Sequence, residues 1–164
     1  MYNWNQKSGK VFITSGIGQG KTKLAAFDTA ELDAKIISTN AIRVSSFVPP
    51  GWQIINSKEG LERLTDNGAF LPIAYAYAVS DSQKVAASVV IGVNSDLSKA
   101  SIIAEDAMVD STEEQSLERS GSCIQEAFKF RGWQVGKLER VAVNTEPREG
   151  LFACALVAVL FFPE

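Results

Sequence analysis

Two adjacent serines, Ser45 and Ser46, lie at the end of a short apolar segment and shortly before Pro49 and Pro50. Proline fixes its own φ and pushes the residue before it towards extended geometry, so the backbone here is restrained. A serine held in such a place can direct its hydroxyl at the preceding carbonyl carbon. The chemistry would be an internal N-to-O acyl shift, in which Ser46 attacks Ser45. Spacing alone favours an ordinary corner between a strand and a turn.

A carboxylate at position 28 is the next candidate. Asp28 is four residues from both Leu24 and Leu32, so a helix predicted over 22–34 would project it between two apolar side chains. Burying a carboxylate is costly unless it has a partner. Asp28 is therefore either a site residue that receives a cation, or a structural residue in an ion pair or at a hydrated edge of the helix, and the nearby Glu31 favours the structural reading.

Glu105 and Asp106 interrupt a strand predicted over 101–109. Adjacent residues of a strand point to opposite faces, so only one of the two acids should face the core or a cleft. An acid removed from water has a raised pKa, which suits a proton donor. The alternative is an edge strand with both acids in solvent.

The composition excludes several classes of site. The chain has no histidine, which removes Ser-His-Asp triads, Cys-His dyads and histidine metal sites, and we expect no metal. Its 16 Lys and Arg against 19 Asp and Glu give a net charge of −3 with no basic cluster, so we expect no nucleic-acid partner.

Two further features bear on where the protein works. The two cysteines fit neither a disulfide framework nor a zinc site, so we expect reduced thiols packed in the core of a cytoplasmic protein. The amino terminus is polar, and the longest apolar run, residues 151–162, is shorter than the roughly 20 residues that span a bilayer. We therefore expect no membrane association.

A glycine-rich stretch over 16–22 is similar to a phosphate-binding loop but does not match it. Counting back from Lys21 and Thr22, the loop requires a glycine at position 15, where this chain has Ser15. We expect a tight connection between a strand and a helix, with glycines free to take positive φ. A nucleotide-binding module is the weaker alternative.

Hydrophobic periodicity and turn residues predict one α+β domain over 1–164. The three central strands should form an antiparallel meander and the last two a hairpin. The last strand has few polar positions, which indicates two stacked sheets with helices outside, or burial in an oligomer. Strands are expected over 10–15, 36–39, 52–55, 70–79, 84–93, 101–109, 137–145 and 151–162, and helices over 22–34, 58–64 and 111–131.

Five stretches, in this order and spacing, resemble the pyruvoyl-dependent arginine decarboxylase family over nearly the whole chain. No single stretch is specific, but the ordered set is. The stretches are residues 24–28, 40–50, 72–77 with Ser80 and Asp81, 131–133, and the apolar carboxyl-terminal strand.

The resemblance implies a self-cleaving enzyme with a four-layer αββα fold of largely antiparallel sheets. Cleavage between Ser45 and Ser46 would give a β chain, 1–45, and an α chain, 46–164. Ser46 would become a covalent pyruvoyl group, which takes the place of a bound cofactor. A Schiff base with this group would convert L-arginine to agmatine and CO2. The family forms trimers with active sites between protomers, so we expect a homotrimer or a multiple of it.

The resemblance also implies roles for single residues. Glu105 matches the proton donor, Asn40 an asparagine that assists near the cleaved bond, and Asp28 the acid that receives the guanidinium of arginine. Phe47 replaces a smaller aliphatic residue and is expected at the pocket wall. The sequence around Glu105 lacks the family's glycine, which leaves Asp106 as an alternative donor.

Three alternatives to this function remain open from the sequence. A pyruvoyl decarboxylase of the same fold could act on another amino acid, since Asp28 indicates a cationic side chain but does not separate arginine from lysine or ornithine. A trimeric relative could keep the fold without processing or catalysis. The third is the nucleotide-binding module.

Overall fold

The computed structural model describes residues 8–36, 38–64 and 68–164, and within these ranges the chain forms nine strands and three helices. In chain order the elements are β1 (Gly9–Gly20), α1 (Lys23–Asp33), β2 (Asn40–Arg43), β3 (Phe47–Val48), β4 (Gln53–Ile54), α2 (Ser57–Glu62), β5 (Phe70–Ser80), β6 (Val85–Asn94), β7 (Ser101–Val109), α3 (Glu113–Arg131), β8 (Val135–Thr145) and β9 (Phe152–Pro163).

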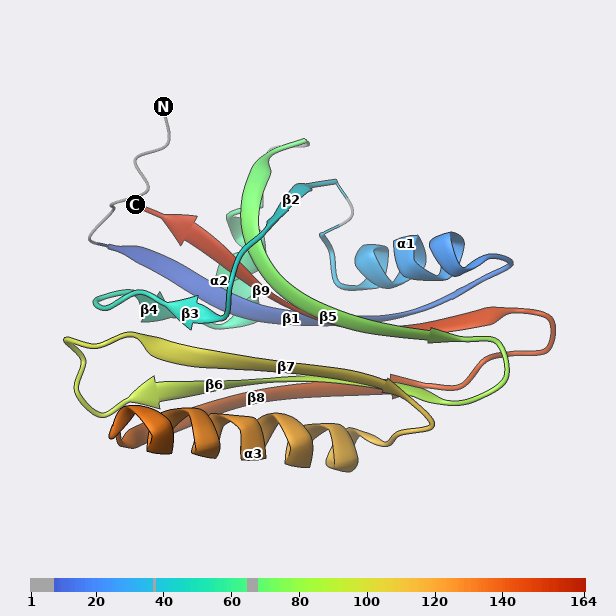
Figure 1. The fold of residues 1–164 in the computed structure, drawn as a ribbon. Coiled ribbons are helices and arrows are strands. Elements are labelled where there is room, and N and C mark those ends of the chain that lie inside the picture. The colour runs from blue at the N-terminus through green and yellow to red at the C-terminus, as the bar shows by residue number, and fades with distance from the viewer. Residues whose placement is uncertain (1–7, 37, 65–67) are drawn as a thin grey trace.

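The strands form two stacked sheets, with α1 and α2 outside one sheet and α3 outside the other (Figure 1). The first sheet has the strand order β2-β5-β9-β1-β4, and the second has the order β3-β7-β6-β8. Pairing is antiparallel except where the short edge strands β2 and β4 run parallel to β5 and β1. These four layers confirm the predicted αββα sandwich.

The last strand, β9, is apolar at nearly every position because both of its faces are buried. Alternate residues of β9 face the space between the sheets, and the others face α1. Side chains of a strand alternate between faces, so a strand covered on both sides requires apolar residues at every position. The protomer itself thus covers both faces of β9.

Two predicted connections are wrong. β5 pairs with β9 in the first sheet, whereas β6 pairs with β7 and β8 in the second, so β5, β6 and β7 are not one meander. For the same reason β8 and β9 do not form a hairpin. The turn residues correctly predict chain reversals, but a reversal can pass from one sheet to the other. Both faces of β6 are buried, one in the core between the sheets and the other against α3.

The tight connection predicted for the glycine-rich stretch is also wrong, because its glycines belong to β1 and do not form a turn. None of them has a positive φ. A Cβ at Gly16, Gly18 or Gly20 would lie 2.1–2.4 Å from backbone atoms of α1 or of the residue that follows it. The glycines therefore let the helix approach the strand closely.

Two smaller expectations are wrong. The second strand begins at Asn40 and not in the predicted range 36–39, of which Ile37 lies outside the described residues. Cys154 is buried but Cys123 is exposed, and both are free thiols. In the part of the chain that the structure describes, no helix is long and apolar enough to cross a membrane.

Replacing Gly18 with alanine is expected to lower the free energy of unfolding by about 2–3 kcal/mol, because the new methyl group would overlap backbone atoms. The two nearest are the carbonyl oxygen of Ala26 at 2.2 Å and the nitrogen of Ala30 at 2.4 Å. The matched control is Gly121→Ala in α3, where nothing lies within 4 Å of the new Cβ. That change should raise stability by about 0.5–1 kcal/mol through helix propensity. Urea unfolding measures both, and equal effects would contradict the close packing of α1 on β1.

Candidate active site

The two serines lie where the chain passes from one sheet to the other. β2 belongs to the first sheet and β3 to the second, and only residues 44–46 separate them. The N–H of Val44 still donates to the carbonyl of Ile73 in the first sheet, at 3.0 Å. The carbonyl of Ser46 already accepts from the N–H of Ile103 in the second sheet, at 2.9 Å. The crossover is therefore fixed on both sides of the Ser45–Ser46 peptide.

Ser46 is the central residue of a three-residue turn. The N–H of Phe47 donates to the carbonyl oxygen of Ser45 at 2.9 Å. Because φ of Ser46 is not positive, this is the inverse form of the γ-turn. The hydrogen bond polarises the carbonyl group of the peptide that joins the two serines, which makes its carbon more electrophilic.

Glu105 approaches the crossover from β7. The hydroxyl of Ser46 donates to Oε2 of Glu105 at 2.8 Å, and both side chains are half-buried. In the β6–β7 register Glu105 is paired with Val89, a buried residue of the core between the sheets. A hydroxyl and a carboxylate at this distance can exchange a proton.

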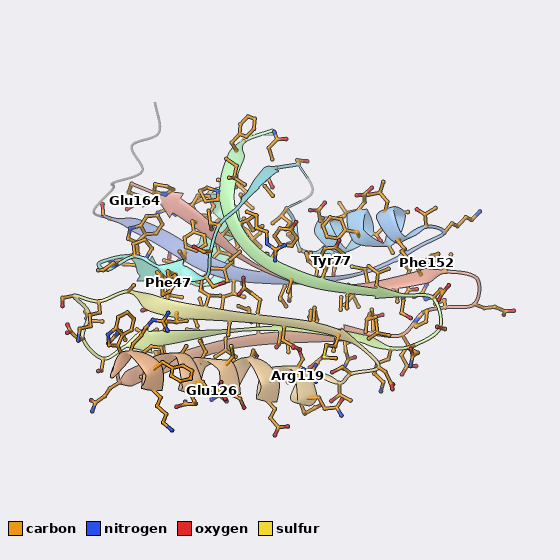
Figure 2. The ribbon with its side chains drawn as sticks, viewed as in Figure 1. Phe47, Tyr77, Arg119, Glu126, Phe152 and Glu164 are labelled. Atoms are coloured by element: carbon orange, nitrogen blue, oxygen red, sulfur yellow. The ribbon has the colours of Figure 1, made fainter. Side chains whose placement is uncertain are left out.

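Asp106 points to the opposite face of β7 and belongs to a structural network. Arg119 on α3 (Figure 2) donates Nε to Oδ1 at 3.0 Å and Nη2 to Oδ2 at 2.8 Å, a paired contact with the carboxylate. The hydroxyl of Ser116 donates to Oδ2 at 2.6 Å. The pKa of the Arg119 guanidinium lies above its ordinary value, chiefly because of its hydrogen bond to Asp106. Of the two acids, only Glu105 contacts Ser46.

The network continues into buried serines that sequence reasoning missed. The hydroxyls of Ser116 and Ser88 are 2.9 Å apart, and those of Ser88 and Ser120 are also 2.9 Å apart. Each of the three is at most 2% exposed. The available signal was the spacing of Ser116, Ser120, Ile124 and Phe128, which continues the apolar stripe of α3 every fourth residue with two serines.

Asn40 lies apart from the Ser46–Glu105 pair. It is the first residue of β2 and is exposed, and its side-chain amide donates to the carbonyl of Gly68 at 2.7 Å. Along the chain it precedes Ser46 on the same strand-to-crossover segment. Among the residues that the structure describes, no contact connects Asn40 with the reacting groups.

Asp28 also lies apart, on the helix that covers the outer face of the first sheet. The predicted apolar side of this helix is wrong, because Leu24 and Leu32 are 69% and 59% exposed while Ala26 and Ala30 are buried. Asp28 is half-buried and, within residues 8–36, 38–64 and 68–164, it has no hydrogen-bond or ion-pair partner. A structural ion pair therefore does not account for its position among the described residues.

The surroundings of Asp28 are acidic and aromatic. The pKa of the Glu31 carboxyl is raised, first by burial and then by the negative charge of Asp28. The neighbouring Phe27 packs on Tyr77 of β5, with ring centres 4.6 Å apart (Figure 2). A cation bound here would meet carboxylates beside an aromatic surface.

Phe47 faces away from the Ser46–Glu105 pair. It is paired with Ile102, a residue of the cluster beneath α3, whereas the next residue, Val48, faces the core between the sheets. The guanidinium of Arg131 lies 5.5 Å from the centre of the Phe47 ring. The structure therefore does not bring Phe47 to the face on which the two reacting side chains meet.

No metal centre is evident in the described ranges, since no three His, Cys, Asp or Glu side chains are grouped closely enough to hold an ion. The arrangement offers a nucleophile, a carboxylate base or acid, and a polarised peptide carbonyl. These groups suit an acyl shift at the peptide between the two serines.

Comparison with known proteins identifies the family. The model of the pyruvoyl-dependent arginine decarboxylase family matches residues 10–164. The chain is 33% identical to the pyruvoyl-dependent arginine decarboxylase of Methanocaldococcus jannaschii, over 82% of this chain and 79% of the relative. It is 32% identical to that of Methanopyrus kandleri, over 93% of this chain and 96% of the relative, and 28% identical to that of Thermococcus kodakarensis, over 94% and 95%. The chain belongs to the pyruvoyl-dependent arginine decarboxylase family.

Proposed function

We propose that this protein is a self-processing enzyme that converts L-arginine to agmatine and CO2 with a pyruvoyl group made from Ser46. The observation that carries the proposal is the 2.8 Å hydrogen bond from the Ser46 hydroxyl to Glu105, at a crossover fixed by both sheets. The names of the relatives give the substrate and the group. The residues present fit that group, because Ser46 supplies its carbon atoms and Glu105 supplies a proton carrier beside them.

Cleavage begins with the Ser46 hydroxyl. Glu105 accepts its proton, and the oxygen attacks the carbonyl carbon of Ser45. The N–H of Phe47, 2.9 Å from the carbonyl oxygen in the uncut chain, stabilises the negative charge that develops on that oxygen. The peptide bond then breaks and an ester forms between the two serines, while the nitrogen of Ser46 becomes a free amine.

Elimination completes the processing without an oxidant or reductant. Loss of the α-proton of residue 46 breaks the bond between Cβ and the ester oxygen, which releases residues 1–45 with a carboxylate at Ser45. The remaining enamine takes up water and loses ammonia, so residue 46 ends as a keto acyl group at the start of chain 46–164. Hydrolysis supplies the new oxygen, and atoms and charges balance.

The pyruvoyl group supplies an electron sink for decarboxylation. After processing, the Ser46 hydroxyl no longer exists, so Glu105 loses the partner it has in the uncut chain. Its side chain is then free to protonate the substrate carbon that has lost CO2. We assign Glu105 both tasks, as proton acceptor in cleavage and as proton donor in turnover, and we assign Asn40 to the same site.

We assign the guanidinium of arginine to Asp28, whose half-buried carboxylate has no described cationic partner. Asp28 lies on α1, which covers the outer face of the first sheet, whereas Ser46 and Glu105 meet on the side that faces the second sheet. One sheet layer therefore separates the two within a protomer. A site completed by Asp28 of a neighbouring copy resolves this separation, which supports a homotrimer, or a multiple of it, as the active form. The two free thiols support a cytoplasmic location.

The intact mass under denaturing conditions tests the proposal first. Two species are expected, corresponding to residues 1–45 and 46–164, the larger being lighter by one ammonia than a simple hydrolytic fragment. Release of CO2 from arginine, lysine and ornithine then identifies the substrate, and arginine should react fastest. An uncut chain would favour a non-catalytic relative, and preference for lysine or ornithine would refute the assignment of arginine.

A further inference from the structure

The end of α3 lies against Phe47, the second residue after the proposed cleavage site. The guanidinium of Arg131 lies 5.5 Å from the ring centre of Phe47 and 5.7 Å from that of Trp133, within cation–π distance of both. Its Nη1 also donates to the carbonyl of Ala127 at 2.9 Å. The guanidinium is thus held by its own helix while it covers the Phe47 ring.

Trp133, the second ring beside the Arg131 guanidinium, is held in place by the end of α3. Gly132 ends α3 in the left-handed conformation with φ 63°, and the N–H of Trp133 donates to the carbonyl of Phe128 at 3.0 Å. This αL ending turns the chain back so that Trp133 packs edge-on against Phe128, with ring centres 6.1 Å apart. Phe128 is 2% exposed and belongs to the cluster between α3 and the second sheet. Trp133 is therefore anchored to the core, and the exposed Arg131 lies against its ring.

Cleavage changes what holds residue 46 in place. In the uncut chain, the preceding segment is tied to the first sheet through Val44 and Ile73. After cleavage, residue 46 is a chain end attached only to β3, which is two residues long. Chain ends fray unless side chains fix them. The hydrogen bond from Ile103 to the carbonyl of residue 46, at 2.9 Å, is the first that such fraying would break.

We propose that Arg131, with Trp133, is a positioning residue that holds the pyruvoyl-bearing chain end on β7 by clamping Phe47. The clamp lies on the α3 face of the second sheet, while the Ser46 hydroxyl meets Glu105 on the other face. Arg131 therefore acts through the backbone of residues 46 and 47 and does not touch the reacting atoms. The aromatic ring of Phe47 is what the guanidinium contacts, so a smaller aliphatic side chain at this position would remove the clamp.

The test rests on the proposed cleavage and uses the cleaved protein. Arg131→Ala and Phe47→Leu should each lower kcat for arginine about threefold, the size of an exposed cation–π contact, with KM nearly unchanged. Hydrogen exchange at the Ile103 amide should quicken by a similar factor. The double variant should be no worse than either single variant, because both remove the same contact. Arg131→Lys, which keeps a cation, should recover part of the loss.

Lys129→Ala is the matched control, because it removes a positive charge from an exposed position two residues away on the same helix. It should leave kcat and Ile103 exchange unchanged. The clamp would be refuted, and the proposed cleavage retained, if the cleaved Arg131→Ala variant kept the kcat and the Ile103 exchange rate of the unchanged enzyme. Effects that multiply in the double variant would refute it in the same way. An unchanged chain that stays uncut would refute the proposed cleavage, and the clamp with it.

Discussion

Replacing Glu105 with glutamine is expected to lower kcat for arginine decarboxylation about 10²–10⁴-fold, the typical contribution of a general acid. Glutamine has nearly the same shape and its amide oxygen can still accept the Ser46 hydroxyl, which the carboxylate does at 2.8 Å. It cannot carry the proton. Cleavage should therefore be slower but still reach completion on prolonged incubation, so that turnover can be measured on the processed protein alone.

Asp106→Asn is the matched control for that experiment, because it removes the same charge from the next residue, on the other face of β7. Its carboxylate accepts from Arg119 and Ser116, so the variant should lose about 1–2 kcal/mol of stability, a value reduced by the partial exposure of Arg119. Its kcat should stay within a few-fold of the unchanged enzyme. The reverse pattern, with normal turnover in Glu105→Gln and a large loss in Asp106→Asn, would transfer the proton donor to Asp106.

Local features of the fold were accessible from the sequence because their causes are local. The capping box of Thr112 and Gln115 predicts the start of α3, and Gly132 predicts its end. β9 is apolar at nearly every position, which indicates a strand that is covered on both faces. The choice of partner strands was not accessible, because a turn fixes a reversal and not the sheet that the next strand joins. For this reason the meander and the final hairpin were wrong.

Side-chain size misled the prediction for the first helix. Large apolar residues normally mark the buried face of a helix, so the sequence predicts that Leu24 and Leu32 are buried. The helix buries Ala26 and Ala30 because the glycines of β1 leave room for a close approach. The sequence does contain both small-residue patterns, the alternating glycines of β1 and the alanines four residues apart in α1. Neither pattern indicates packing until the helix and the strand are known to be neighbours.

The site could be predicted in part. The family resemblance implies its two reacting residues, Ser46 and Glu105, whereas spacing and strand alternation alone leave the corner and the choice of acid open; the structure joins the two side chains. The decision between Glu105 and Asp106 needed the α3 network, whose member Ser88 has no sequence pattern of its own. The proposed contribution of Asp28 relies on a second copy of the chain, and neither sequence spacing nor one protomer tests it. Its assignment stays a prediction.

Replacing Ser46 with alanine is expected to abolish cleavage and all decarboxylation, the largest effect of any single change in this chain. Alanine has no oxygen to attack Ser45, so no ester forms and no keto group can follow. The fold should survive, because the backbone carbonyl of residue 46 keeps its 2.9 Å hydrogen bond from Ile103. Intact mass should show one species of full length, and Tm should stay within a few degrees.

Ser45→Ala separates the roles of the two serines. The hydroxyl of Ser45 takes no part in the acyl shift, and its side chain is exposed. The turn at Ser46 uses only the backbone carbonyl of residue 45, which alanine retains. This variant should therefore be cleaved at the same peptide and should decarboxylate arginine at a similar rate. If Ser45→Ala stayed whole while Ser46→Ala was cut, the nucleophile would be Ser45, and the contact between Ser46 and Glu105 would lose its proposed meaning.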